Sequence, residues 1–390
     1  MLKLRGLYYI THIDNLTSIL ERGILSHSLV EKNKIEYTAI YDKEIIDKRY
    51  DITTPDGRSL WDFANLYFQP RNAMLYRVVF FSGKDRNDVI IIGIKASVLN
   101  REDIFITTGN AASYGTQILP IKEGKKIIKS IREEVDKEWW AYEDGSKRKL
   151  MAECLIPEKV SPNYIQEIYV PTWKSAEKVK NILTKINIKL PVIPEPELFF
   201  LPTREIPLTD NLHLVEGDMF LSRMQTLTVS VNIVGVMGKG LASRAKYQFP
   251  DVYVFYQDLC KSGELKMGKP YLYKRESSLD FILVDEPEKL PNFNLQTWFL
   301  LFPTKRHWRQ FADIRGIEEG LKWLLNNYKD EGIRSLAIPA LGCGLGWLEW
   351  GYVGPILCKY LSKMEIPVKL YLPMEKRIPD EQLDKKFLLE

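Results

Sequence analysis

The sequence has little cysteine, no long apolar run and almost no excess of charge. Its 390 residues include only four cysteines, Cys154, Cys260, Cys343 and Cys358, and no CxxC pair. Neither a disulfide framework nor a thiolate metal site is therefore indicated. The longest apolar runs, such as VIIIGI at 89–94, are far too short to span a bilayer, and the first residues lack the apolar core of a signal peptide. We expect a cytoplasmic protein with no metal and no membrane contact.

The charge balance is typical of an ordinary globular protein, and the chain is long enough to form two hydrophobic cores. Basic and acidic side chains number 55 and 51, for a net charge of +4. This small excess does not by itself predict nucleic-acid binding. Hydrophobic residues make up 45% and charged residues 27% of the chain. A chain of 390 residues is too long for a single ordinary core and favours two domains.

A proline-rich stretch indicates where the chain divides. Five of the 21 prolines lie between Pro191 and Pro207. Because proline fixes φ and cannot donate a backbone hydrogen bond, we expect an extended connector that is neither helix nor sheet. The predicted division is a first domain over 1–186, a linker over 187–210, a second domain over 211–375 and a tail over 376–390.

The two halves differ in the order of their predicted elements. In the second half, strand-like and helix-like segments alternate from LHLVEGD (212–218) to IPVKLYLP (366–373). This alternation predicts an α/β fold with a mixed, mainly parallel sheet and helices on both faces. The first half has a short helix at NLTSILERG (15–23) and strands at MLYRVVFF (74–81), DVIIIGIKA (88–96) and AECLIP (152–157), which predicts an α+β fold.

Two glycine-rich stretches follow predicted strands in the second half. The first, VGVMGKGLASRAK (234–246), fits neither the Walker pattern, because Leu241 stands where Ser or Thr is needed, nor the Rossmann pattern, because Ser243 replaces the third glycine. The second, PALGCGLGWLEWG (339–351), carries alternating glycines. Glycines alone are as consistent with a tight turn between a strand and a helix as with a ligand-binding loop. Two loops rich in backbone amides at one sheet edge, however, predict a diphosphate site.

These loops, with GDMF (217–220) and FPTKRHWR (302–309), resemble the macrodomain, a module that binds ADP-ribose. Within that family the likeness is to the DarG antitoxins, which remove ADP-ribose from DNA, and it covers roughly 211–375. It implies that an aspartate accepts a hydrogen bond from adenine and that a threonine and a lysine act at the reacting end. The implied ADP-ribose-binding residues are Asp218, Met219, Asn232, Gly238, Gly240, Leu241, Thr304, Gly342, Cys343, Gly344, Leu345 and Gly346, and the implied catalytic residue is Lys305.

Lys305 lies in a basic cluster with Arg306, His307 and Arg309, and a lysine in such a cluster is most often simply solvated. The catalytic alternative is that neighbouring cations lower the pKa of its amine, so that a neutral lysine attacks the anomeric carbon of a ribosylated base. Some ADP-ribosyl hydrolases pair such a lysine with an aspartate in the second loop. This chain has no aspartate there, and DarG-like proteins share that absence.

The first half resembles the DarT toxins, which transfer ADP-ribose from NAD to bases of single-stranded DNA. The likeness covers about 1–185 and is carried in order by YYITHIDNLTSILERGILS, IIDKR, FQPRNAMLY, TTGNAAS and AECLIP. It implies NAD as a substrate and single-stranded DNA, with thymidine as the preferred base, as a partner. The residues it implies are Glu153 and Arg49 for catalysis and Thr11, His12, Ile13, Arg49, Met74 and Tyr76 for NAD binding.

Each of these residues also has an ordinary structural interpretation. Glu153 could be a strand residue that faces solvent, and His12 could serve packing, in a turn whose following helix Asp14 caps. An arginine stays charged in proteins, so Arg49 is better suited to clamp the diphosphate or stabilise an ionised base than to accept a proton. The strand with Met74 and Tyr76 could equally be plain core. The segment 111–152, with Trp139, Trp140 and Tyr142, suits a DNA-binding loop and a solvated helix equally well.

The combined prediction is a toxin–antitoxin fusion in which the first domain attaches ADP-ribose to DNA and the macrodomain removes it. Fusion raises the local concentration of the second activity around the first. Only PMEKRIPDEQLDKKFLLE follows the last predicted strand, which is too short for the toxin-binding domain of full-length DarG-like antitoxins. We therefore expect control by hydrolysis, assisted by intramolecular pairing of the two domains. The alternatives are an ADP-ribose reader tethered to an inactive transferase, and a transferase that acts on protein or RNA.

Overall fold

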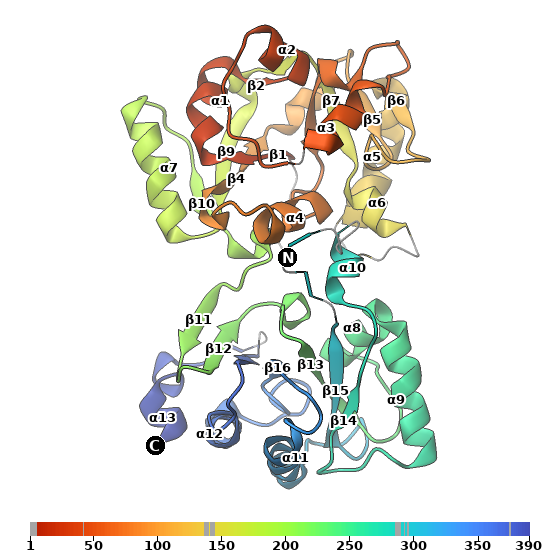
Figure 1. The fold of residues 1–390 in the computed structure, drawn as a ribbon, viewed down its shortest axis with the longest axis vertical. Coiled ribbons are helices and arrows are strands. Elements are labelled where there is room, and N and C mark those ends of the chain that lie inside the picture. The colour runs from red at the N-terminus through yellow and green to blue at the C-terminus, as the bar shows by residue number, and fades with distance from the viewer. Residues whose placement is uncertain are drawn as a thin grey trace. The chain divides into compact units, whose positions relative to one another are not determined.

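The computed structural model describes residues 6–41, 43–135, 140, 145–284, 290–291, 293–294, 296–373 and 376–390. The chain packs as two compact units (Figure 1). The first comprises Met1–Phe200 with Ile282–Phe293, and the second comprises Leu201–Phe281 with Asn294–Glu390. The boundary at residue 200 falls inside the predicted linker, but Ile282–Phe293 interrupts the range predicted for the second domain. None of the described helices combines the length and apolar character that crossing a membrane requires.

The first unit is built on one mixed sheet, as the predicted α+β fold requires. Its strands lie in the order β10-β9-β4-β1-β3-β7-β5-β6, and all neighbours are antiparallel except β10 and β9. A short pair, β2 and β8, lies apart from it. The strands are β1 Leu7–His12, β2 Ile24–Leu25, β3 Phe63–Tyr67, β4 Val89–Ile94, β5 Phe105–Thr107, β6 Ile118–Pro120, β7 Glu153–Pro157, β8 Lys159–Val160, β9 Ile165–Val170 and β10 Val192–Pro194.

Helices surround this sheet and begin at recognisable caps. For example, α7 starts after Thr172, whose hydroxyl accepts the N–H of Ser175, and the helix runs beside β9 and β10 (Figure 1). The strand β4 is fully buried along its length, as the run VIIIGI suggested. The helices are α1 Leu16–Arg22, α2 His27–Lys32, α3 Lys43–Tyr50, α4 Ala73–Phe81, α5 Ile121–Val135, α6 Ser146–Leu150 and α7 Trp173–Lys185.

The segment MLYRVVFF is helical, so the predicted strand there was wrong. It forms most of α4, which Asn72 caps by accepting the N–H of Leu75 through its side chain. A short apolar run that is buried nearly all round carries no periodicity that separates strand from helix. The capping asparagine after Pro70 was the available signal.

The second unit is a mainly parallel sheet, which confirms the predicted α/β fold. Its order is β11-β12-β17-β16-β13-β15-β14, with only the two edge strands antiparallel. The strands are β11 Arg204–Pro207, β12 Leu212–Glu216, β13 Thr226–Asn232, β14 Tyr271–Tyr273, β15 Trp298–Lys305, β16 Leu336–Pro339 and β17 Val368–Tyr371. The helices are α8 Gly240–Gln248, α9 Pro250–Ser262, α11 Ile314–Asn327, α12 Trp350–Leu361 and α13 Lys385–Leu389, while the short α10 Leu279–Leu283 spans the point where the chain passes to the first unit.

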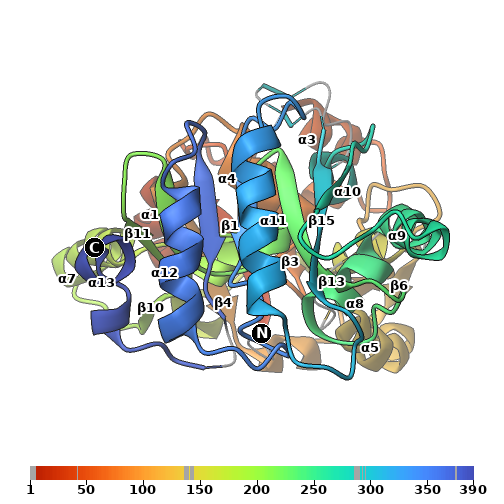
Figure 2. The ribbon, with the colours of Figure 1, turned by 90° about the horizontal axis from the view of Figure 1, so that it is seen from below.

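Both faces of this sheet are covered by helices because its central strands are apolar on both sides. From β15, Leu300 and Phe302 enter the core that α11 and α12 share, and these two helices lie side by side (Figure 2). Phe299 points the other way and meets Phe249, at the start of α9, with ring centroids 4.7 Å apart. The alternation along β15 therefore fixes which helices lie on which face.

The proline-rich stretch contains strands, contrary to the predicted connector without sheet, and the C-terminal tail contains a helix. Within 187–210, β10 pairs with β9 and β11 pairs with β12, each as the edge strand of a sheet. Edge strands tolerate proline because their outer N–H groups need no partner, so proline content alone did not exclude strands here. Within 376–390, α13 packs on α12, and Leu383 and Leu388 are buried in the core of the second unit.

Candidate active sites

The first unit contains a cavity of about 810 Å³. Its walls come from β1, β3, α3, α4 and the segment 35–41, which precedes α3. Asn15 holds that segment: its Nδ2 donates to the Thr38 carbonyl at 2.9 Å, and its Oδ1 accepts the Thr38 N–H at 2.8 Å. A cavity of this size suits a dinucleotide.

Glu153 and Arg49 form a buried, two-pronged ion pair beside this cavity. Arg49 Nη2 lies 2.9 Å from Glu153 Oε2, and Nη1 lies 3.2 Å from Oε1. The Glu153 side chain is 0% exposed and that of Arg49 is 12% exposed. Burial by itself lowers the pKa of Arg49, but the Glu153 charge outweighs it and the pKa stays above the usual value. Arg49 lines the cavity, whereas Glu153 lies behind it and is not part of the described lining.

The backbone fixes Glu153 in place, and the solvent-facing interpretation is excluded. Glu153 begins β7 and pairs with Tyr67 on β3. Its N–H donates to the Thr107 hydroxyl at 2.8 Å, and its Oε1 accepts the N–H of Ala111 at 2.9 Å. Ala111 belongs to the loop TTGNAAS, so this loop and the carboxylate are held together. Burial, and then the charge of Glu153, raises the pKa of Tyr67, which stays neutral as it lines the cavity.

The cavity wall is cationic and aromatic. Among the described lining residues, Glu36 is the sole carboxylate, and a diphosphate would meet a positive surface there. Burial, and then Tyr37, raises the pKa of Tyr9 to about 12, so this ring also stays neutral. The lining cations are Arg49, Arg77, Lys147 and Arg148, and the lining aromatic residues include Tyr9, Tyr37, Tyr41, Trp61 and Tyr67.

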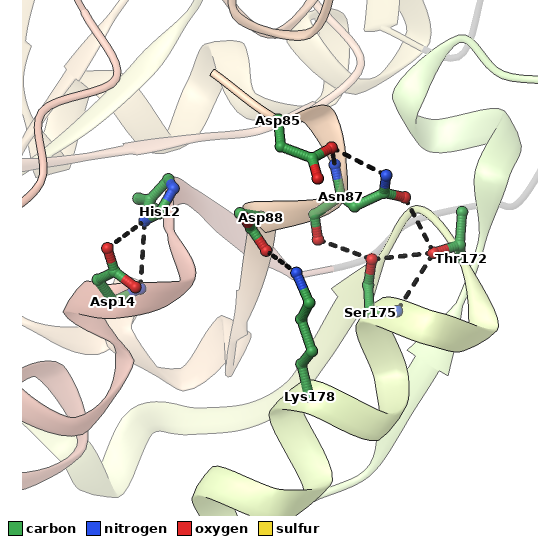
Figure 3. Close-up of polar contacts among 8 residues, drawn as sticks. All are labelled: His12, Asp14, Asp85, Asn87, Asp88, Thr172, Ser175 and Lys178. Carbon is green, nitrogen blue, oxygen red and sulfur yellow. Dashed lines mark hydrogen bonds and ion pairs between the residues drawn. The ribbon is translucent and has the colours of Figure 1, made fainter.

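Thr11 lines the cavity, whereas the described lining includes neither His12 nor Ile13. His12 ends β1 and caps the following 3-10 turn, because its Nδ1 accepts the N–H of Asp14 at 3.3 Å (Figure 3). The predicted capping role of Asp14 was therefore wrong: the histidine is the cap. Beside it, the start of β4 is fixed to α7 by Lys178, whose Nζ lies 2.5 Å from Asp88 Oδ1, and by Ser175, which donates to the Asn87 carbonyl (Figure 3).

Two aromatic predictions need correction. Met74 lines the cavity, but Tyr76 is fully buried in an aromatic cluster with Phe80, Phe81 and Phe200 and is not part of the wall. Trp140 is also buried, with its ring centroid 5.9 Å from that of Phe200, so it offers no face to a nucleobase. Trp139 and Tyr142 lie outside the described residues. Tyr114, which sequence reasoning missed, directly follows the TTGNAAS loop, is fully exposed and also lines the cavity.

In the second unit, the predicted ligand residues gather at the carboxyl edge of the sheet. The parallel strands β12, β13, β15 and β16 all end there. Asn232 at the end of β13 pairs with Lys305 at the end of β15, after a shift in register that leaves Thr304 without a partner residue on β13. Thr304 is buried, and its hydroxyl lies 3.4 Å from the Val231 carbonyl. This arrangement places both glycine loops and the lysine at one edge, as predicted.

Asn232 shapes the first glycine loop. Its Oδ1 accepts the N–H groups of Val234 (3.1 Å) and Val236 (3.3 Å), and its Nδ2 donates to the Val236 carbonyl. In the described part of the chain, no acceptor takes the amides of Gly238 and Gly240, which precede and begin α8. Gly240 has φ +60°, and a Cβ there would lie 3.3 Å from Leu345 Cδ1. The loop therefore presents open amides at a helix N-terminus and faces the second loop. Leu241 follows half-buried in the first turn of α8, and Met219 is buried after β12.

The second glycine loop is a tight turn that only glycine permits. Gly342 has φ +80°, and a Cβ on Gly346 would lie 2.3 Å from the Gly342 carbonyl oxygen. The Cys343 N–H donates to the Ala340 carbonyl, whereas the N–H groups of Gly344 and Leu345 have no acceptor among the described residues. Those two residues are exposed at the turn. Both loops thus offer backbone donors to an anion.

Lys305 is bound to the second loop and does not point freely into water. Its Nζ donates to the Leu345 carbonyl at 2.5 Å. Partial burial lowers the pKa of the Lys305 amine below the usual range of lysine. Desolvation is the cause, and not the neighbouring cations that the sequence suggested. The solvated-cluster interpretation fits Arg306 and Arg309, which are exposed, but not Lys305.

Asp218 has a partner that the sequence did not predict. Its Oδ1 accepts the Phe220 N–H at 3.0 Å, and its Oδ2 lies 2.8 Å from Nη2 of Arg244 on α8. The guanidinium of Arg244 lies over the Phe220 ring, 5.0 Å from its centroid. An arginine one helix turn after the glycine loop was the available sequence signal.

Comparison with known proteins decides the family. A fusion protein of Thermosipho africanus, described as a DNA ADP-ribosyl transferase–DNA ADP-ribosyl glycohydrolase, is 61% identical over 388 residues, which cover 100% of this chain and 99% of that protein. The chain belongs to this DarTG family. A family model for the ssDNA thymidine ADP-ribosyltransferase DarT matches residues 8–200.

Two further comparisons agree with this DarTG assignment. The solved structure of Thermosipho africanus DarTG in complex with ADP-ribose superposes with a TM-score of 0.91 at 60% identity, covering 99% of this chain and 100% of that one. A DNA ADP-ribosyl glycohydrolase of Thermus aquaticus is 34% identical over 165 residues, which cover 42% of this chain and 42% of that protein. The chain therefore joins a DarT-like ADP-ribosyltransferase to a DarG-like glycohydrolase macrodomain.

Proposed function

We propose that the first unit transfers ADP-ribose from NAD to a thymidine of single-stranded DNA and that the second unit hydrolyses it off again, each through the residues described above. The observation that carries the proposal for the first unit is the Arg49–Glu153 pair at the wall of a cationic cavity. For the second unit, it is the partly buried Lys305 amine, which is bound to the second glycine loop at the sheet edge where both glycine loops lie.

In the transfer step, the bond between nicotinamide and ribose breaks through an oxocarbenium-like state, and neutral nicotinamide leaves. A carboxylate beside the ribose holds its 2′-hydroxyl and offsets the positive charge that develops. We assign this role to Glu153, whose carboxylate accepts the Ala111 N–H at the start of β7. The base then attacks the ribose carbon and loses a proton, and a cation near the base stabilises its ionised form.

Arg49 covers Glu153 in the structure, so NAD binding has to change the contacts of Arg49. Its guanidinium lines the cavity while both prongs bind Glu153. Two oxygens of a tetrahedral phosphate can accept both prongs of a guanidinium, as the two oxygens of a carboxylate do. We infer that Arg49 exchanges Glu153 for the diphosphate, or for the ionised base, when substrate enters.

We expect Arg49→Lys to lower the transfer rate about a hundredfold, because lysine keeps the charge but not the two-pronged geometry. The measurement is the initial rate of NAD-dependent labelling of a thymidine-containing oligonucleotide. Arg58→Lys is the matched control, since Arg58 forms an exposed pair with Asp56 away from the cavity wall. Equal rates for Arg49→Lys and the parent protein would remove Arg49 from the mechanism.

In the second unit, a neutral Lys305 attacks the anomeric carbon of the modified nucleotide and releases the base. Water then displaces the lysine, so the sum is addition of water across the glycosidic bond to give free ADP-ribose and unmodified DNA. The partial burial of Lys305 favours the neutral amine that this attack requires. The Leu345 carbonyl holds the amine beside the second loop until substrate arrives.

We expect Asp218→Ala to weaken ADP-ribose binding about tenfold or more, because a hydrogen bond from the adenine amino group to a charged acceptor is lost. Isothermal titration calorimetry with ADP-ribose measures this loss. Asp251→Ala is the control, since Asp251 also forms a 2.8 Å pair with an arginine, Arg275, within the same unit. Similar losses from both variants would show that unit stability, and not ligand contact, explains the effect.

One experiment separates this proposal from its rivals. Protein with Lys305→Ala is incubated with NAD and, separately, single-stranded DNA, RNA and protein acceptors, and the products are identified by mass spectrometry. We expect ADP-ribose on DNA alone, on thymidine. Label on RNA or protein alone would contradict the DNA assignment, and no label on any acceptor would favour a reader tethered to an inactive transferase.

A further inference from the structure

Large apolar side chains stand exposed around the catalytic lysine of the second unit. They lie on the two loops that flank Lys305, namely the segment 306–311 after β15 and the turn of the second glycine loop. Protein surfaces rarely expose several such side chains together without a binding function. We call Trp308 (46% exposed), Phe311 (72%), Leu345 (51%) and Trp347 (71%) the aromatic rim.

Backbone hydrogen bonds hold the two loops against each other. The N–H of Asp313 donates to the Thr304 carbonyl at 2.8 Å, which closes the segment between them into a compact loop. The N–H of Ala312 donates to the Gly346 carbonyl at 3.0 Å, and Lys305 Nζ donates to the Leu345 carbonyl. The rim is therefore one surface, built from both loops, with the reacting amine at its base.

Trp347 holds its exposed position at a backbone cost. Its φ is +64°, in the left-handed region that a non-glycine residue occupies at a cost. The turn forces this conformation, since the Trp347 N–H donates to the Gly344 carbonyl and the Leu348 N–H donates to the Gly342 carbonyl. Asparagine or glycine would suit the turn better. A tryptophan that is strained and yet leaves its indole in water points to a ligand for that indole.

The charges beside the rim are positive. The segment 305–312 contains Lys305, Arg306 and Arg309 and no acidic residue. Within the described chain, neither Arg306 nor Arg309 has an ion-pair partner. The Arg309 guanidinium lies over the Trp308 ring, 4.5 Å from its centroid, and the His307 ring stacks on Trp308 with the centroids 5.4 Å apart. Exposed aromatic side chains interleaved with arginines are the chemistry that binds single-stranded nucleic acid.

We propose that the aromatic rim is a platform for single-stranded DNA, on which the nucleotides flanking the modified base stack while Lys305 acts on the ribose. The inference rests on the proposed hydrolysis of ADP-ribosylated DNA and adds how that substrate is held. The open amides of the two glycine loops bind the ADP-ribose, whereas Trp308 and Trp347 bind the strand, with Arg306 and Arg309 facing its phosphates. The macrodomain thereby prefers modified DNA to free ADP-ribose or a modified nucleoside.

The test compares two substrates in full-length protein that carries Glu153→Gln to silence transfer. One substrate is an ADP-ribosylated single-stranded oligonucleotide of about eight nucleotides, which is long enough to stack on either side of the modified base. The other is the ADP-ribosylated nucleoside. The readout is kcat/KM for release of ADP-ribose from each.

Trp308→Ala combined with Trp347→Asn is expected to lower kcat/KM about tenfold or more for the oligonucleotide and to leave the nucleoside unchanged, because only the longer substrate loses stacking. Asparagine is chosen because it tolerates a positive φ, so the turn is preserved. Trp308→Ala combined with Trp347→Phe should lose less kcat/KM for the oligonucleotide than Trp308→Ala combined with Trp347→Asn. Trp173→Ala is the matched control, since Trp173 is 74% exposed at the start of α7 in the first unit.

Each outcome has a distinct meaning. Equal losses on both substrates, or no loss on either, would overturn the platform while hydrolysis itself stands. Release of ADP-ribose from neither substrate by the parent protein would instead overturn the proposed hydrolysis. If the two substitutions lowered kcat/KM equally for an ADP-ribosylated RNA strand of the same sequence, the assignment of the platform to DNA would be wrong.

Discussion

The Lys305→Ala protein is expected to lose removal of ADP-ribose from DNA by on the order of a thousandfold or more, because the substitution removes the amine that attacks the anomeric carbon in the proposed mechanism. With the transferase unit intact, ADP-ribosylated DNA should then accumulate and expression should become toxic. The measurements are colony formation on induction and quantification of ADP-ribosylated thymidine in the extracted DNA.

Two controls separate this effect from others. Lys305→Ala combined with Glu153→Gln should be harmless, because no ADP-ribose is attached to DNA and none has to be removed. Lys322→Ala removes an exposed lysine of α11 and should leave the removal of ADP-ribose from DNA unchanged. A toxic double variant, or a Lys305→Ala protein that still clears modified DNA, would contradict the assigned role of Lys305.

The pH dependence of the parent protein tests the same lysine. Burial lowers the pKa of the Lys305 amine, and the neutral amine is the reactive form. The neutral fraction therefore rises with pH through a midpoint below the ordinary lysine value of about 10.4. Single-turnover hydrolysis at increasing pH should rise through that midpoint, whereas binding of ADP-ribose should stay nearly constant.

The second large effect is expected from Glu153→Gln, which should lower transfer by on the order of 10²–10³. Glutamine matches the shape of the side chain and can still accept the Ala111 N–H, but it carries no charge to offset the oxocarbenium. The measurement is the initial rate of oligonucleotide labelling with saturating NAD, so that weaker binding does not appear as slower chemistry.

Glu153→Gln also leaves the buried Arg49 without its counter-charge, which costs about 3–5 kcal/mol in comparable buried pairs. Arg49→Gln combined with Glu153→Gln removes both charges and should recover thermal stability but not activity. A Glu153→Gln protein that is folded, binds NAD and still transfers at the parent rate would contradict the electrostatic role.

The misplaced elements show where sequence reasoning reaches its limit. Apolar content correctly located β4, but for α4 it could not decide between strand and helix, because that segment is buried on nearly all sides. Tyr76 and Trp140 came from motif-bearing segments, yet both rings point into one aromatic cluster around Phe200. A motif specifies residue types along the chain and does not say which side chains face a ligand.

The same limit applies to partners distant in the sequence. Arg49 and Glu153 are 104 residues apart, and each was predicted as a site residue without any sign that they bind each other. The contacts of Asp218 with Arg244 and of Lys305 with Leu345 were equally hidden. Such contacts follow from strand order, which no local pattern encodes.

The sequence by itself determined the two domain classes and the two glycine loops, and it proposed Lys305 and Glu153 as catalytic candidates, because these depend on residue types at short spacing. Only the tertiary structure decided that Glu153 lies buried behind Arg49, that desolvation lowers the pKa of Lys305, and that the two loops beside Lys305 each expose an indole. Burial, charge pairing and exposure are properties of neighbours in space, and the sheet brings those neighbours together from distant parts of the chain.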